Sequence, residues 1–270
     1  MAVAIALLIG ALYRSLDGNI QSSRAELKGI VSVKPTLQLI QFLQQHRGMS
    51  AGVLAGNEAM KEKRAAKAKE VASGLAAVEA VTSPELIGGK AWKAIVAEWK
   101  QIDAEVLGWT GVESFGRHTA LIESVLSFMT DIADYSALTL DPDIDSYYLI
   151  DTVMNKAPYA LERLGQMRAR GTGILTKKQM MPQQQVEMNT LMAELNGALR
   201  PLKVNLEKTA RFNPDLQAQL TQATKDYMES AEQINKVILE DMMLGSFAMP
   251  PGDYFQMTTV AIDKGYKQMF

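Results

Sequence analysis

The chain has 270 residues, of which 47% are hydrophobic and 21% are charged, with only nine prolines and nineteen glycines. This composition fits a folded, mainly helical protein and excludes disordered, collagen-like and disulfide-rich classes. The net charge of −2 disfavours a nucleic-acid binder, and the absence of cysteine removes thiol chemistry and cysteine zinc sites.

The amino-terminal stretch of residues 1–13 reads MAVAIALLIGALY and carries no charged side chain. Thirteen helical residues rise about 20 Å, which is short of the ~30 Å hydrocarbon core of a membrane. The stretch also lacks the basic start and the cleavage site of a secretory signal. We therefore interpret residues 1–14 as the outer end of a transmembrane helix whose beginning is missing from this chain. A buried core helix is the alternative.

Prolines, glycines and turn residues divide the chain into eight long pieces of helical composition, without the alternating pattern of strands. The predicted helices cover about residues 1–55, 58–81, 89–107, 112–138, 144–176, 182–211, 214–243 and 254–270. Short connections favour antiparallel neighbours. The predicted fold is all-α, an elongated double four-helix bundle whose long first helix continues from a transmembrane span.

The segment 37–56, LQLIQFLQQHRGMSAGVLAG, carries the clearest indication of a site. A heptad frame places Arg47 on the buried stripe and Gln44 one turn before it. A buried guanidinium requires an anionic partner, because an unpaired one is costly to bury. Gly48, Ser50 and the small residues after them leave space beside the arginine. The pattern predicts a small-anion site at Arg47, Gln44 and Ser50. The alternative is an arginine paired with a core Glu or Asp, or extended to the bundle surface.

The segment 164–175, LGQMRARGTGIL, repeats the Arg-Gly step followed by small residues. Arg170 directly precedes a glycine, as Arg47 does, whereas helical phase places Arg168 on the inward-facing stripe. We predict Arg170 first, and Arg168 beside it, as the second cation of the site.

No pattern of catalytic or metal-binding residues is visible. The two histidines, His46 and His118, are 72 residues apart and form no ligand motif. Nucleotide-binding loops and hydrolase or metalloprotease motifs do not occur. The sequence therefore predicts a protein that is not an enzyme and has no cofactor and no metal site.

Three segments in order carry a resemblance to a known class of domain. They are LQLIQFLQQHRGMSAGVLAG, FGRHTALIESVLSFMTDIADYSALTLDPDIDSYYLIDTV and APYALERLGQMRARGTGIL. Together they resemble the extracytoplasmic sensor regions of bacterial transmembrane receptors, such as methyl-accepting chemotaxis proteins. The first and third are similar to the nitrate- and nitrite-sensing domain family, which is an all-helical double four-helix bundle. The resemblance covers most of residues 25–270.

The resemblance implies a function and a location. It implies that residues 15–270 form a sensor domain in the periplasm, anchored in the inner membrane through its terminal helices. In the family an arginine pair from two helices holds the anion, which by motif would be Arg47 and Arg170 here. The expected ligand is nitrate, nitrite or a carboxylate, the expected partner is a second copy, and nucleic acid is not expected. The alternatives are the sensor part of a histidine kinase or diguanylate cyclase, or a helical module that binds a partner protein.

Overall fold

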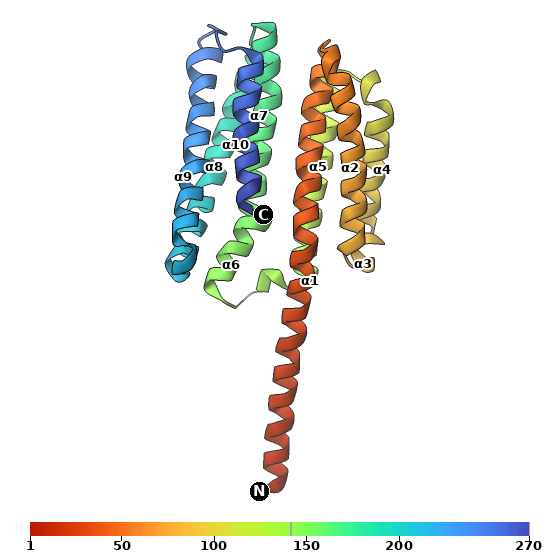
Figure 1. Cartoon of the computed structure of the whole chain (residues 1–270), viewed down its shortest axis with the longest axis vertical. Coiled ribbons are helices and arrows are strands. Elements are labelled where there is room, and N and C mark those ends of the chain that lie inside the picture. The colour runs from red at the N-terminus through yellow and green to blue at the C-terminus, as the bar shows by residue number, and fades with distance from the viewer. Residues whose placement is uncertain (141, 270) are drawn as a thin grey trace.

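The computed structural model describes residues 1–140 and 142–269. Within these ranges the chain forms helices and their connections, with no strand. Figure 1 shows two helical bundles standing side by side, with the first part of one helix extending alone beyond both. The prediction of an elongated, all-α double bundle with a long first helix is confirmed.

The first bundle contains four long helices and one short one. They are α1 (Ala2–Leu54), α2 (Lys61–Val81), α3 (Pro84–Ile87), α4 (Lys90–Glu105) and α5 (Gly111–Tyr135). The short α3 lies between the predicted helices 58–81 and 89–107, and Ser83 caps it by accepting a hydrogen bond from the Leu86 N–H at 3.4 Å. Thr110 caps α5 in the same way. The boundaries of the long helices agree with the predicted ones to within a few residues.

The second bundle is formed by the rest of the chain. Its helices are α6 (Ile144–Asp151), α7 (Ala157–Lys177), α8 (Pro182–Phe212), α9 (Gln217–Val237) and α10 (Pro251–Met269). The sequence predicts one helix over 144–176, with a kink at Pro158. The structure places a π-helical turn, Thr152–Lys156, just before that proline. Pro158 has no N–H to donate, so a local change of helix type there has a direct physical cause. The last predicted residue, Phe270, lies outside the described residues.

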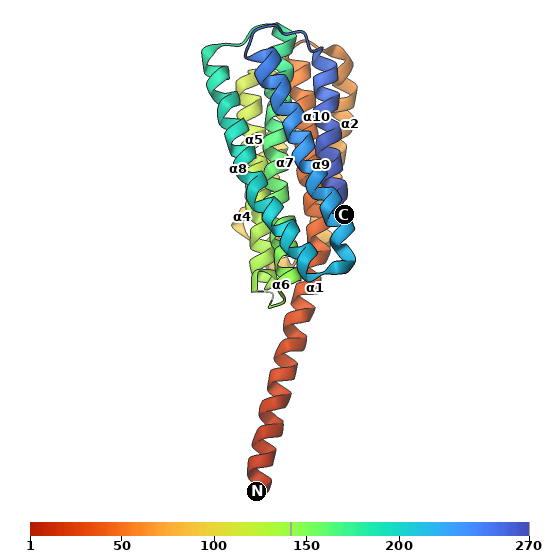
Figure 2. The same cartoon turned by 90° about the vertical axis from the view of Figure 1, so that its left-hand side faces the viewer.

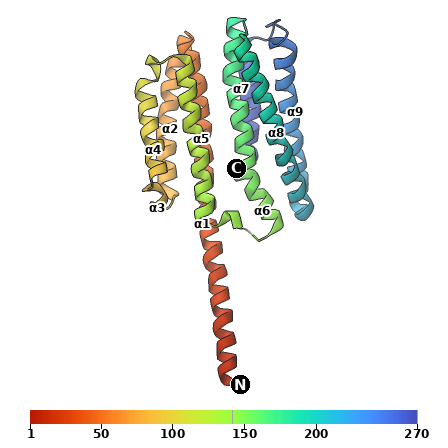
Figure 3. The ribbon, with the colours of Figure 1, turned by 180° about the vertical axis from the view of Figure 1, so that it is seen from behind.

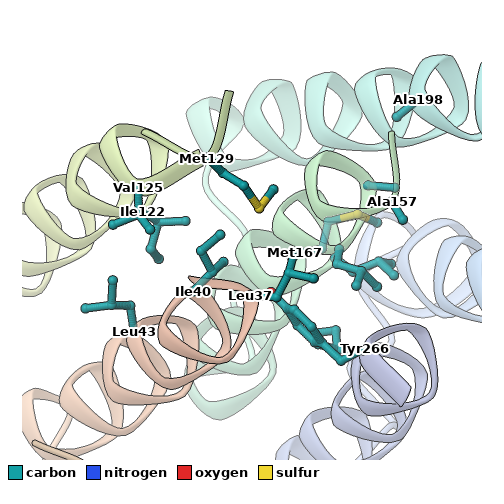
Figure 4. Packing of buried hydrophobic residues seen from close by; sticks show 14 of the residues in the cluster. Leu37, Ile40, Leu43, Ile122, Val125, Met129, Ala157, Met167, Ala198 and Tyr266 are labelled. Carbon is teal, nitrogen blue, oxygen red and sulfur yellow. The ribbon is translucent and has the colours of Figure 1, made fainter. Parts of the chain in front are cut away.

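The two bundles share one hydrophobic core, because α1 packs against α7 as well as against its own bundle. Figure 4 shows Leu37 and Ile40 of α1 at this contact. Met129 of α5 lies on one side of them, and Met167 of α7 and Tyr266 of α10 lie on the other. Figure 3 shows α7 standing beside α1 and α5 along the bundle length. Polar side chains at this contact are therefore covered by helices of both bundles.

The amino-terminal part of α1 leaves the bundles and runs on as a single helix, as the turned view in Figure 2 also shows. Its apolar side chains are exposed, including Leu16, Ile20 and Leu27, which are each at least half accessible. Among the described residues, no helix is both long enough and apolar enough to span a membrane. The interpretation of residues 1–14 as the end of such a span stays a prediction.

Candidate functional site

A cluster of buried polar side chains lies where α1 of the first bundle meets α7 of the second. It contains Gln44 and Arg47 of α1 and Glu162, Gln166 and Arg168 of α7. Gly165 of α7 makes the close approach possible. A Cβ atom on this glycine would lie 3.0 Å from Nη2 of Arg47 and 3.6 Å from the side-chain amide carbon of Gln44. The absent side chain therefore leaves the space that the Arg47 guanidinium occupies.

Arg47 is buried, with 1% of its surface exposed, and pairs with a carboxylate of the other bundle. Its Nη1 donates to Oε1 of Glu162 at 2.6 Å, and its Nη2 donates to Oε2 at 3.2 Å. Nη1 also donates to Oγ1 of Thr119 on α5 at 2.9 Å. This is the core ion pair that the sequence left open as the alternative to an anion site. The pair joins the two bundles through a two-point contact of high directional specificity.

Glu162 is equally buried and accepts four hydrogen bonds. Besides the two from Arg47, Gln44 Nε2 donates to Oε2 at 2.9 Å and Gln166 Nε2 donates to Oε1 at 2.8 Å. Both carboxylate oxygens are therefore satisfied by donors from α1 and α7. Such complete satisfaction is what allows a charged carboxylate to remain inside a core.

Arg168 is the second buried guanidinium, also 1% exposed. Its Nη1 donates to Oγ1 of Thr259 on α10 at 2.9 Å, and its Nη2 donates to the carbonyl oxygen of Gln44 at 3.3 Å. Its guanidinium carbon lies 5.1 Å from the ring centre of Phe255. All of these partners are neutral. Within the part of the chain that the structure describes, no carboxylate forms an ion pair with Arg168.

The buried part of the cluster therefore carries one positive charge in excess, because Glu162 balances only one of the two guanidiniums. Asp263 of α10 also attracts Arg168, but it is exposed to solvent and accepts a hydrogen bond from Gln41 at 2.9 Å. Burial and the nearby charge of Arg47 lower the pKa of Arg168 to about 10, against the opposing effect of the Asp263 and Glu162 carboxylates. Arg168 is still charged at neutral pH. Burial, together with the charge of Glu162, raises the pKa of the Tyr266 hydroxyl, which donates to Oε1 of Gln44 at 3.2 Å. Tyr266 is thus a neutral donor in this cluster.

Three buried polar atoms of the cluster have no hydrogen-bond partner among the described residues. They are the Nε atoms of Arg47 and Arg168 and the Oγ atom of Ser50. Buried donors are normally satisfied, so these atoms could donate to a small bound group. Ser50 of α1 is fully buried.

Arg170 lies on a different side of α7 from Arg168. Its Nη1 forms an ion pair with Glu187 of α8, and about a third of its side chain is exposed. Its guanidinium carbon lies 4.4 Å from the ring centre of Phe115, and that of Arg47 lies 5.2 Å from the same ring. The structure therefore brings Arg47, Gln44 and Arg168 together, and places Arg170 at the edge of the cluster. Helical phase, rather than the Arg-Gly motif, indicates which arginine contacts α1.

A cavity of about 210 Å³ lies next to this cluster, between α1, α7 and α10. Gly48 and Gly52 line it on α1, Thr172 and Gly173 line it on α7, and Phe255 lines it on α10. The ring of Phe255 thus borders the cavity and also lies beside the Arg168 guanidinium. The small residues Gly48, Ala51 and Gly52 line this cavity, whereas Arg47 and Ser50 do not.

His46 and His118 form a buried pair on the α5 side of α1. The Nδ1 atom of His118 lies 2.7 Å from the Ser114 carbonyl oxygen, which can only accept, so this nitrogen carries the proton. Its Nε2 then accepts from Nδ1 of His46 at 2.9 Å. Burial lowers the pKa of His46 to about 2 and that of His118 to about 4. The pair is therefore neutral at pH 7.

Sequence reasoning missed several groups of the cluster. They are Glu162, Gln166, Thr119, Thr259 and Phe255. The sequence could have indicated the inward position of Glu162. Glu162 lies beside the apolar stripe of α7 and four residues before Gln166, so both side chains lie on one face of the helix. The residues of α5 and α10 had no such signal, because their position depends on how the helices pack.

Comparison with protein-family models places the chain in a class and then in a family. The class that the structure defines is an all-helical double bundle with buried arginines at its central contact. The family model for nitrate and nitrite sensing matches residues 38–268. Because the match covers most of the chain, the protein belongs to the nitrate- and nitrite-sensing domain family. This is a family of sensor domains rather than of catalysts. Neither the search of the curated proteins nor that of the solved structures finds a match.

Proposed function

We propose that this domain binds nitrate or nitrite as a single monovalent anion at the contact of α1 and α7, beside Arg168 and Arg47. The observation that carries the proposal is the burial of Arg168 without an anionic partner among the described residues. A small anion there would balance the excess charge of the cluster. Nitrate is planar and weakly hydrated and offers only acceptors, which matches guanidinium donors in a dry site.

The unpaired donors and the neighbouring cavity support this position. An anion oxygen beside the two guanidiniums would accept from their Nε atoms, and Ser50 offers a hydroxyl from the same helix as Arg47. The cavity at Gly48 and Phe255 leaves room for a small group next to Arg168. A movement of the Phe255 ring would connect this cavity with the region beside the Arg168 guanidinium. Gln44 fixes Arg168 through its backbone carbonyl and fixes Glu162 through its amide.

We also propose that α1 carries the signal. It runs without interruption from Ala2 to Leu54, so it links Arg47 at the anion site to Arg14, which at 1.5 Å per residue lies about 50 Å away. An anion that binds one bundle arrangement more tightly than another shifts the population between them, and α1 moves with it. In this proposal residues 1–14 enter the bacterial inner membrane, the bundles lie in the periplasm, and the receptor is of the chemotaxis type.

The exposed face of α1 supports self-association in the same proposal. Leu16, Ile20, Leu27 and Ile30 are each about half exposed or more, and their spacing of four, seven and three residues follows one heptad seam. Two copies of this helix would bury the seam as a parallel coiled coil. A homodimer would place both amino-terminal segments on the same side, as a membrane receptor requires.

Calorimetric titration of the purified chain with nitrate, nitrite and acetate tests the anion site. Arg168→Gln should abolish nitrate binding, whereas Arg200→Gln, which removes an exposed arginine of α8, should leave it unchanged. A ligand at one hundred times its Kd adds about 2.7 kcal/mol to the free energy of unfolding, which raises Tm by about 5–10 °C. Loss of binding in Arg170→Gln alone would support the motif assignment instead. Failure of the native chain to bind any of the anions would refute the proposal.

A further inference from the structure

Glu162 is a buried carboxylate inside a cluster proposed to bind an anion, which is an unexpected charge for such a place. Its side chain is as inaccessible as those of the two arginines, and its four hydrogen bonds hold it between α1 and α7. A carboxylate there repels any incoming anion. Its presence therefore lowers the affinity of the site for anions, so Glu162 must contribute another property, such as selectivity between anions.

The charge balance of the cluster identifies this property. Two guanidiniums without a carboxylate would carry two positive charges in a dry environment, and such a site favours a divalent anion such as sulfate. With Glu162 the excess is one charge, held by Arg168. A monovalent anion then leaves the cluster neutral, whereas a divalent anion leaves one uncompensated negative charge in the core. Uncompensated buried charges are strongly disfavoured.

We propose that Glu162 is the residue that restricts the site to monovalent anions, by neutralising Arg47 and leaving only the charge of Arg168 for the ligand. This inference rests on the proposed function, since it concerns the same site. Gln44 and Gln166 support the role because each donates to one oxygen of the carboxylate, which fixes Glu162 against Arg47. Selection by charge then needs no additional contact with the ligand.

Perchlorate and sulfate provide the sharpest pair of probes. Both are tetrahedral anions with four oxygens, and they differ chiefly in charge. The ratio of the sulfate Kd to the perchlorate Kd therefore reports selection by charge, and nitrate serves as the reference ligand. All titrations are made on the full chain at constant ionic strength. The Arg168→Gln variant measures the background at other surfaces.

In Glu162→Gln the cluster carries two excess positive charges. We expect the Kd ratio of sulfate to perchlorate to fall at least tenfold, and nitrate to bind at least tenfold more tightly, because one repelling charge is gone. Glu187→Gln is the matched control. Glu187 also pairs with an arginine, Arg170, but it lies at the partly exposed edge of the cluster, so its removal should leave the ratio unchanged.

The double variant Arg47→Met/Glu162→Gln restores the excess of one charge without leaving an unpaired partner in the core. It should bind nitrate more weakly than the native chain, because the donor of Arg47 is lost, but its Kd ratio of sulfate to perchlorate should stay as high as that of the native chain. If Glu162→Gln fails to fold, this variant still decides the question, because sulfate binding as tight as perchlorate binding in it would overturn selection by charge count.

Two experimental outcomes distinguish the role of Glu162 from the existence of the anion site. Nitrate binding that depends on Arg168, together with an unchanged Kd ratio in Glu162→Gln, would overturn only the role of Glu162. Absence of nitrate binding in the native chain would overturn the anion site itself, and the role of Glu162 with it.

Discussion

Arg47 of α1 and Glu162 of α7 form a buried ion pair that joins the two bundles, with Nη1 and Oε1 separated by 2.6 Å and both side chains 1% exposed. The two residues are far apart in the sequence and lie on helices of different bundles. Any event that weakens their contact also weakens the attachment of α7 to α1. The stability of the domain and the proposed response to an anion therefore depend on the same pair.

Breaking this pair on one side should strongly destabilise the fold. Arg47→Met leaves the Glu162 carboxylate buried without its charged partner, and we expect a loss of about 3–5 kcal/mol in the free energy of unfolding. Arg47→Met/Glu162→Gln removes both charges and should recover most of that loss. Denaturant unfolding followed by circular dichroism measures both values. Equal destabilisation by the single and double variants would show that packing, not charge, dominates here.

The close approach at Gly165 should be intolerant of larger side chains. A side chain there meets Nη2 of Arg47, which Glu162 holds in place, so Gly165→Val should cost about 1–3 kcal/mol and reduce anion binding. Gly173→Val is the matched control on the same helix, because no atom lies within 4 Å of a Cβ built there. Thermal unfolding compares the two. A similar Tm for both variants would contradict the proposed tight contact between α1 and α7.

The histidine pair should make the domain sensitive to mild acid. Both histidines bind protons more weakly in the folded state than in the unfolded state, where the pKa is about 6.5. As the pH falls below about 6.5, the unfolded state takes up protons first, and the free energy of unfolding decreases. Each histidine contributes about 1.4 kcal/mol per pH unit until the pH reaches its folded pKa, which for His118 is about 4.

Denaturant unfolding at pH 7, 6 and 5 measures this dependence. The double variant His46→Gln/His118→Gln should show a much flatter profile over that range, because it lacks both titrating groups. The carboxylates titrate mainly below this range, so they do not obscure the comparison. An unchanged slope in the variant would show that other groups cause the acid sensitivity.

The exposed heptad seam of α1 should control self-association. Ile20→Glu places a charge on the seam, and we expect it to shift the chain from dimer to monomer in sedimentation equilibrium. Gln21→Glu adds the same charge at the next residue, which is exposed but lies off the seam, and should leave the dimer intact. A native chain that sediments as a monomer would argue against the coiled-coil seam.

The sequence by itself determined the helices and the inward position of the key arginines. Prolines, glycines and the 3.6-residue apolar period act locally, so the long helices and the double-bundle class could be predicted. The heptad frame also placed Arg47 and Gln44 correctly on the buried face of α1, and helical phase did the same for Arg168. These are properties of one helix at a time.

Only the tertiary structure decided what those arginines contact. The pairing of Arg47 with Glu162, and the neutral partners of Arg168, depend on the register between α1, α7 and α10, which no local pattern encodes. Arg170 shows the same limit, because its motif resembles that of Arg47 while its helix face directs it to Glu187. The excess charge of the cluster is a sum over separate helices, and it exists only once packing has brought them together.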